Sequence, residues 1–279
     1  MAYETLGGSA LDYRMCRYGT SRLLFRGPKA PLSAPYTLFL GGTATFGRFV
    51  PRPFPALAGA ELGIATVNMG LVNAGLDAYA GDETVLDAVA RAETVVIQIV
   101  GAQNLSNRFY TVHPRRNDRF LGATEALAAR YPEMDFTEFS FTRHLLTRLE
   151  QRDPGRFLGI VEALQARWTA QMERLVQAAG GRAVLLWLAD APPPQEAASI
   201  VDGMDPLFVD VTMMARLAAR AEHTVRVIPS RAALAAGTRG MVFSEFEAPV
   251  AAATVGPAIH AEVAEALCPV LQRMNAAAA

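Results

Sequence analysis

The stretch LFLGGTATFGRFV, from Leu38 to Val50, decides how this chain folds. Its apolar run ends in two glycines, two threonines then flank an alanine, and a further glycine follows. A buried strand that leaves through such small residues enters a tight turn before the next element. Three interpretations fit: an elbow that presents a hydroxyl for chemistry, a loop whose free amides hold an anion, or a tight turn in a packed core.

Other apolar runs resemble the one that contains Leu38. They are rich in Val, Ile, Leu and Phe without alternation, which is typical of parallel strands covered on both faces. Segments of helical periodicity separate them, as in βαβ units. We therefore predict an α/β fold, a three-layer sandwich around a central parallel sheet of about five strands. The predicted strands are Tyr36 to Leu40, Gly63 to Asn68, Thr94 to Val100, Ala183 to Leu188 and Thr224 to Ile228.

Helical periodicity predicts the longest helix over residues 154–178. Asp153 is placed as its N-cap, Pro154 occupies the first helical position, and Gly180 stands just past the end. Further helices are expected over residues 83–92, 139–150 and 256–274.

Length and composition indicate one compact unit. With 279 residues, 51% of them hydrophobic, the chain can bury one sizeable core. We expect an N-terminal arm, residues 1–34, packed on a single α/β domain, residues 35–279. A net charge of −1 argues against a nucleic-acid partner. No signal peptide or membrane-spanning run is recognised, so we expect a cytoplasmic protein without a membrane partner.

Two polar excursions interrupt the alternation of strands and helices, Asn104 to Phe136 and the segment that begins at Ala191. Long loops of this kind are uncommon in compact domains and are often functional. The first excursion carries a basic cluster beside the expected site, which suits an anionic substrate, a solvated face or a subunit contact in a homo-oligomer. The cluster consists of Arg108, His113, Arg115, Arg116 and Arg119.

The arm alternates basic and apolar side chains. Arg14, Arg17, Arg22 and Arg26 are interleaved with tyrosines, leucines and a phenylalanine. We expect the rings to lie in the core and the arginines to point outward. The alternative is an arm that covers a neighbouring subunit.

Candidate site residues follow the predicted strands, because ligands of open α/β sheets bind at the carboxyl ends of the strands. Gly41 to Gly47 follows the first strand, Asn68 to Gly75 the second and Gly101 to Arg108 the third, while His260 stands near the last helix. A hydroxyl, amide donors and a histidine in this order favour acyl transfer. Cys16 and Cys268 match no metal or redox spacing.

These blocks resemble the SGNH, or GDSL-like, hydrolase superfamily, and the predicted sheet is correspondingly SGNH/flavodoxin-like. That superfamily carries Gly-Asp-Ser-x-Thr, Asn-x-Gly, Gly-x-Asn-Asp and Asp-x-x-His in the same order. The chain is still more similar to a bacterial family of unknown function, through CRYGTSRLLFRGP in the arm and GGTATFGRFVPRPFP at the elbow. That closer resemblance spans nearly the whole chain and brings no known reaction with it.

The SGNH resemblance implies a role for each matching position. Thr43 falls on the nucleophilic serine and His260 on the base. Pro257 stands where the superfamily has aspartate, so Glu245 or Glu247 would have to orient the histidine. The resemblance gives oxyanion or substrate-binding roles to Gly70, Asn73, Gly75, Gln103 and Asn107. Arg108, from the basic cluster, is a further candidate for binding the substrate.

Two functions follow from this resemblance. The first is an ester hydrolase or acyl transferase that acts on a small or carbohydrate ester, at a site that departs from the superfamily pattern. Its mechanism needs no metal and no organic cofactor. The alternative is a non-catalytic SGNH-like protein that binds an anionic carbohydrate or a protein partner. A phosphate-binding loop ranks last, because the glycine-rich turn lacks the lysine of a P-loop.

Overall fold

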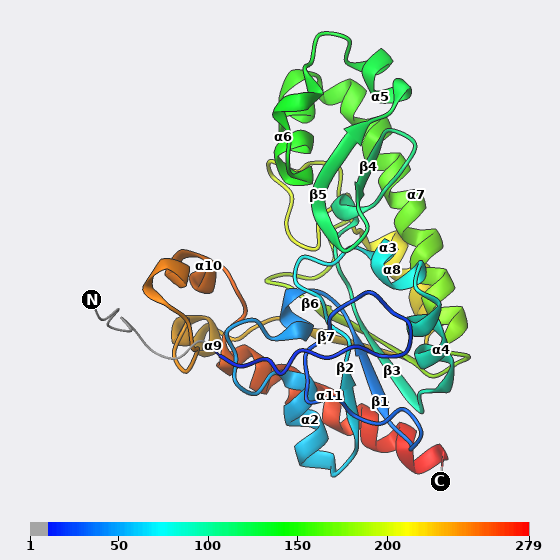
Figure 1. Ribbon diagram of the computed structural model, residues 1–279, viewed down its shortest axis with the longest axis vertical. Coiled ribbons are helices and arrows are strands. Elements are labelled where there is room, and N and C mark those ends of the chain that lie inside the picture. Colours follow the sequence, from blue (N-terminus) through cyan, green and yellow to red (C-terminus); the bar gives the residue numbers. More distant parts are fainter. Residues whose placement is uncertain (1–10, 279) are drawn as a thin grey trace.

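The computed structural model describes residues 11–278, and its centre is a parallel sheet of five strands in the order β2-β1-β3-β6-β7 (Figure 1). All five predicted strands are confirmed. The second begins later than expected because Gly63, with a φ of 66°, ends helix α2 and the turn after it occupies the predicted start. The strands are β1 (Thr37–Leu40), β2 (Thr66–Asn68), β3 (Thr94–Gln98), β6 (Ala183–Leu188) and β7 (His223–Val227).

The predicted helices are also present. Helix α7 (Pro154–Ala178) has the expected bounds, and the Asp153 side chain accepts its capping hydrogen bond from the Arg156 amide at 2.9 Å. The other predicted helices are α4 (Glu83–Arg91), α6 (Thr142–Arg152) and α11 (Pro257–Ala278). The remaining elements are α1 (Thr43–Phe46), α2 (Phe54–Leu62), α3 (Leu76–Ala80), η1 (Ala102–Asn104), α5 (Glu125–Arg130), η2 (Phe136–Glu138), α8 (Val211–Ala218), α9 (Arg231–Ala236), η3 (Glu245–Glu247) and α10 (Ala248–Ala252).

Two hydrophobic cores form the three-layer sandwich. Successive side chains of β1 point to opposite faces, so Leu38 and Leu40 enter one core and Phe39 the other. The first core is closed by α3, α4, α7 and α8, and the second by α2, α9 and α11. Because both faces are covered, the strands need apolar residues at nearly every position.

A second part of the molecule rises from the carboxyl end of the sheet (Figure 1). It contains β4 (Tyr110–His113) and β5 (Arg116–Ala123), an antiparallel pair, with α5, η2 and α6 around it. The sequence predicted an irregular excursion here. The strands escaped notice because their alternation is short: Tyr110 and Val112 are buried, and Thr111 between them is exposed.

The arm contributes to the core between residues 11 and 34. Tyr18, Leu23 and Phe25 are buried, as expected for the apolar side chains. The expectation that every arginine points outward is wrong for Arg26, which is 7% exposed, whereas Leu24 is 43% exposed. Arg26 is buried because its guanidinium serves as a hydrogen-bond donor to the turn after β1, as described below. Residues 1–10 of the predicted arm lie outside the described residues.

Within residues 11–278, no helix combines the length and the hydropathy that crossing a membrane requires. Both cysteines are free thiols. Cys268 is buried, and Cys16 is partly exposed.

Candidate functional site

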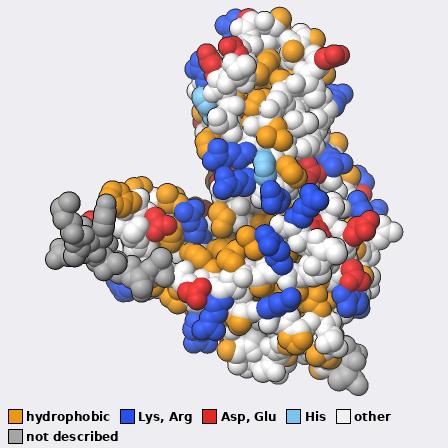
Figure 2. Space-filling model, in the orientation of Figure 1, with side chains coloured by type: hydrophobic (Ala, Val, Ile, Leu, Met, Phe, Trp, Pro, Cys, Tyr) orange, Lys and Arg blue, Asp and Glu red, His pale blue; other side chains and the backbone are white. Residues whose placement is uncertain are grey.

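A cavity of about 940 Å³ lies at the carboxyl end of the sheet, beside the loops that follow β1, β3 and β6. The chain moves outward from β1 in both directions, to β2 on one side and β3 on the other, so the loops diverge at this point. Helix α6 and the segment from Met204 to Pro206 wall one side, and α9 and residues 252–255 the other. Figure 2 shows this face hollowed between the part that contains β4, β5 and α6 and the part that contains α9 and α10, with hydrophobic side chains below the place where the two parts meet.

The turn after β1 is held by Gln98, the last residue of β3. Its Oε1 atom accepts hydrogen bonds from the Gly42 amide at 3.1 Å, the Thr45 amide at 3.1 Å and the Thr45 hydroxyl at 2.6 Å. This packing requires glycine at position 41, where a Cβ atom would lie 2.2 Å from Thr45 Oγ1. The GGTAT turn is therefore an elbow fixed from the neighbouring strand.

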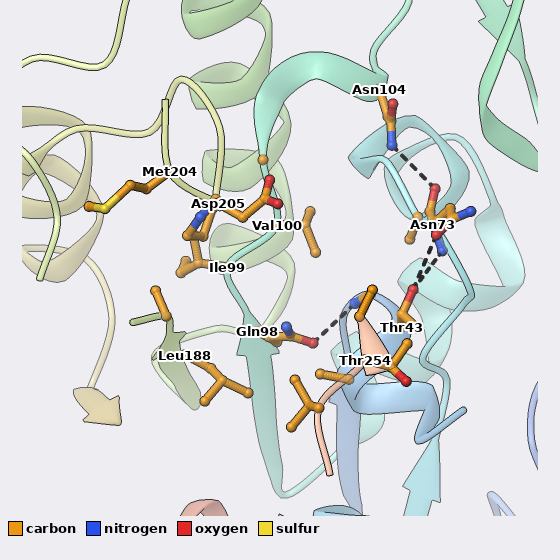
Figure 3. Close-up of a pocket in the computed structure, with 18 of the residues that line it drawn as sticks. Thr43, Asn73, Gln98, Ile99, Val100, Asn104, Leu188, Met204, Asp205 and Thr254 are labelled. Atoms are coloured by element: carbon orange, nitrogen blue, oxygen red, sulfur yellow. Dashed lines mark hydrogen bonds between the residues drawn. The ribbon is translucent and has the colours of Figure 1, made fainter. Parts of the chain in front are cut away.

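Thr43, the predicted nucleophile, lines the cavity, and its hydroxyl is paired with Asn73. Oγ1 of Thr43 accepts a hydrogen bond of 3.0 Å from the Asn73 amide and donates one of 3.3 Å to Asn73 Oδ1 (Figure 3). Asn73 adopts a positive φ of 55°, which turns its amide group toward the hydroxyl. The acceptor of the threonine proton is thus a neutral amide oxygen.

A polar network extends from Asn73 into the second part of the molecule. Asn73 Nδ2 donates to Asp118 Oδ2 at 3.1 Å, and Asn104 Nδ2 donates to the Asn73 carbonyl at 3.4 Å. Asn104 Oδ1 accepts a bond of 2.6 Å from the Thr142 hydroxyl. All four side chains line the cavity, so they form one wall rich in hydroxyl, amide and carboxyl groups.

His260 lies in the core beside the cavity and not in its wall. The ring is fully buried and stacks on Phe54, with ring centroids 5.7 Å apart. Its Nδ1 atom accepts a hydrogen bond of 3.1 Å from the Phe54 amide at the start of α2. Burial, together with the nearby charge of Arg26, lowers its pKa to about 3. His260 is therefore neutral at ordinary pH and caps a helix.

The structure does not join His260 to the groups expected around it. Within residues 11–278, the ring of His260 makes no hydrogen bond to Thr43, Glu245 or Glu247, and the hydrogen bonds of Thr43 go to Asn73. Glu247 accepts hydrogen bonds from Ser244, which lowers the pKa of its carboxyl group. The nucleophile, base and carboxylate implied by the resemblance are thus not assembled into a triad in the described chain.

Two predicted glycines are required for packing, and their amides are already occupied. The Gly70 amide donates to Asn68 Oδ1 at 2.9 Å, and a Cβ atom at Gly70 would lie 2.3 Å from the Phe46 nitrogen. The Gly75 amide donates to Asn117 Oδ1 at 2.8 Å. Neither amide is free to stabilise an oxyanion.

The remaining predicted residues divide between the cavity and the surface. Gln103 lines the cavity, and within residues 11–278 its buried Oε1 atom has no hydrogen-bond partner. Asn107 forms a local turn, in which it donates to the Leu105 carbonyl and accepts from the Phe109 amide. Arg108 lies over the Phe109 ring at 4.7 Å. Asn107 and Arg108 are outside the cavity wall.

Sequence reasoning missed several residues of the cavity wall. Asp118 belongs to the strand β5 that was expected to be a loop, and Thr142 opens α6. Arg143 and Asp205 form an ion pair of 3.1 Å at the wall. The only available signal was the polar character of the two excursions, which does not say which side chains point inward. No group of three or more potential metal-ligating side chains occurs in the described chain.

The sequence matches the family described as a domain of unknown function, DUF6473, over residues 1–275. The chain belongs to this family. A search of curated proteins found no match. Among solved structures, the chain is similar to the crystal structure of the lipase Lip_vut3 from a goat rumen metagenome, at 14% sequence identity and a TM-score of 0.32. The matched region covers 67% of this chain and 74% of the lipase chain. A TM-score this low carries no information about reaction or ligand.

Proposed function

We propose that this protein binds a polyhydroxylated small molecule of the carbohydrate class in the cavity, without cleaving an ester at Thr43. The observation that carries this proposal is the position of His260, whose Nδ1 atom caps α2 while Thr43 is paired with Asn73. The protein is then an SGNH-like binding protein. The elbow after β1 and the strand order support that relationship. They also support the position of the ligand, since doubly wound sheets bind ligands where their strand order reverses.

In the described part of the chain, Thr43 is not hydrogen-bonded to a base of the kind that a hydroxyl nucleophile needs. A threonine hydroxyl becomes nucleophilic when an adjacent group with a suitable pKa takes its proton. The side-chain oxygen of Asn73 accepts a hydrogen bond from the Thr43 hydroxyl, but an amide oxygen is far too weak a base to take the hydroxyl proton. The link from Asn73 to Asp118 runs through the amide nitrogen, a donor, so it does not relay a proton from Thr43.

The polar wall suits hydroxyl groups of a ligand. Asn73, Asn104, Asp118 and Thr142 offer both donors and acceptors over one surface. The residues that line the cavity include three carboxyl side chains, Asp118, Asp190 and Asp205. The positive charge among them is that of Arg143, which is paired with Asp205. We therefore propose a neutral ligand in place of the anionic one expected from the arginines of the β4–β5 region.

Saturation-transfer NMR with a panel of neutral and acidic monosaccharides tests the binding function. We expect neutral sugars to give transfer signals that Asp118→Ala abolishes. Asp87→Asn, on the exposed side of α4, is the control and should leave them unchanged. Acidic sugars that bind more strongly than neutral ones would contradict the proposed ligand charge.

A fluorophosphonate probe followed by intact mass tests the absence of a nucleophile. We expect no adduct on the wild-type protein. An adduct that both Thr43→Ala and His260→Ala abolish would restore the ester hydrolase or acyl transferase in place of the binding protein.

A further inference from the structure

The cavity has two chemically different halves. Figure 3 shows Thr43, Asn73 and Asn104 on one side, and Ile99, Leu188 and Met204 on the other. The second half, here called the apolar half, lies at the ends of β3 and β6 and beside α9 and residues 252–255. Its side chains are Ile99, Leu188, Met204, Leu234, Val255 and Ile259.

Two large side chains of the apolar half remain open to solvent. Met204 is 51% exposed and Leu234 is 48% exposed, although both line a concave surface. Ile99, Leu188 and Ile259 line the same half, each at most 9% exposed. Apolar side chains gathered in a concavity and rimmed by polar groups are typical of ligand sites. Water in this half would be exchanged favourably for an apolar group.

The two halves belong to one continuous cavity, which restricts what can fill it. Its volume of about 940 Å³ is at the upper end of the range of about 300–1,000 Å³ for small-molecule sites. The hydrogen-bonded polar wall lies toward α6 and β5 and consists of Asn73, Asn104, Asp118 and Thr142. A ligand that fills the cavity therefore places a polar group against Asn73 and Asp118 and an apolar group against Leu188 and Leu234.

We propose, resting on the function proposed above, that the ligand is amphipathic, with a neutral hydroxyl-bearing head and an alkyl chain. The head contacts the polar wall, and the chain lies along the apolar half between β6 and α9. A ligand with an alkyl chain fills both halves of the cavity with one molecule. A free sugar would leave water in the apolar half.

Alkyl β-glucosides of increasing chain length test this inference by titration calorimetry, at concentrations below those at which micelles form. We expect affinity to rise about four-fold for each methylene from methyl to hexyl glucoside, the gain from burying one methylene group. An affinity that stays flat with chain length would overturn the amphipathic ligand. If methyl glucoside still binds, the proposed function survives that result.

Variants then assign each half. With Met204→Gln and Leu234→Gln combined, the gain from butyl to hexyl glucoside should fall from about sixteen-fold to below about four-fold. Leu158→Gln is the matched control, because Leu158 is 49% exposed on α7 and outside the cavity, and it should keep the full gain. Asp118→Ala should weaken all the glucosides by one common factor.

The remaining outcomes are also informative. Hexanol that binds as tightly as hexyl glucoside would overturn the inference, because the chain would then bind without a head. A normal chain-length gain with no effect of Asp118→Ala would keep the alkyl site and overturn the polar-head assignment. No binding of any glucoside at millimolar concentration would overturn the amphipathic ligand, whereas the sugar panel tests the proposed function separately.

Discussion

Gln98 Oε1 accepts a hydrogen bond of 2.6 Å from Thr45 Oγ1, and this contact joins the end of β3 to the elbow after β1. The same oxygen accepts the amides of Gly42 and Thr45, so one side chain satisfies three buried donors. Thr43 stands within this elbow. A residue on another strand thus holds the backbone on both sides of Thr43.

Replacing Gln98 tests how much the elbow depends on this contact. Gln98→Leu leaves the three donors unpaired in the core, which should lower the free energy of unfolding by about 2–4 kcal/mol. Urea unfolding measures the change. Gln151→Leu, at an exposed position of α6, is the control and should change the free energy by less than about 0.5 kcal/mol. Equal stability of the two variants would mean that the elbow holds without Gln98.

Arg26 holds the far side of the same elbow. Its guanidinium donates to the carbonyls of Phe46 at 3.1 Å and Gly47 at 2.5 Å, and to those of Val50 and Pro51 at 2.8 and 2.9 Å. Burial lowers its pKa, but arginine keeps its charge. Arg26→Met should reduce the free energy of unfolding by about 2–4 kcal/mol, since buried carbonyls lose their donors.

The matched control for Arg26 is Arg22→Met, because Arg22 is exposed on the same arm. Chemical unfolding should place this variant within about 0.5 kcal/mol of the wild type. Arg26→Lys should recover only part of the loss, because a single ammonium group does not reach as many carbonyls as the guanidinium. Full recovery by lysine would show that charge, and not the fork of donors, stabilises the turn.

His260 predicts a specific dependence of stability on pH. Its pKa is lowered from 6.5 to about 3 in the folded protein, because burial disfavours the charged ring. Protonation therefore favours the unfolded chain: the contribution of the neutral ring is complete above pH 6.5 and is lost as pH falls from there toward 3. At pH 4.5 the loss should be about 2–3 kcal/mol, at 1.36 kcal/mol per pH unit.

Carboxyl groups also lose stabilising interactions in acid, so the variant His260→Gln isolates the histidine. The difference in unfolding free energy between wild type and His260→Gln should shrink as pH falls from 7 to 4.5. A difference that is constant over this range would contradict a buried, neutral His260.

Gly70 and Gly75 are predicted to reject even a methyl group. A Cβ atom would lie 2.3 Å from the Phe46 nitrogen at Gly70 and 1.9 Å from the Asn104 carbonyl oxygen at Gly75. Each Gly→Ala variant should be destabilised by about 2–3 kcal/mol in thermal or urea unfolding, because backbone must move apart. At Gly122 the added Cβ would meet no atom of residues 11–278 within 4 Å beyond its chain neighbours, so Gly122→Ala should be tolerated.

The sequence by itself determined the layered sheet. Each strand is a run of apolar residues, and helix α7 is bounded by its own N-cap Asp153 and by the glycines after Ala179, so these signals are local and readable in order. The β4–β5 pair was not readable, because its alternation is short and its surface is charged.

The site was decided by tertiary structure. Thr43 and Asn73 were recognised because they follow strands, but their pairing depends on the positive φ of Asn73. His260 was predicted to act as a base, whereas its hydrogen-bond partner in the structure, the Phe54 amide, is 206 residues away in the sequence. Hydrogen-bond partners at such separations leave no periodic pattern in a sequence. They are decided when the layers of the fold pack together, because each buried donor must then find an acceptor nearby.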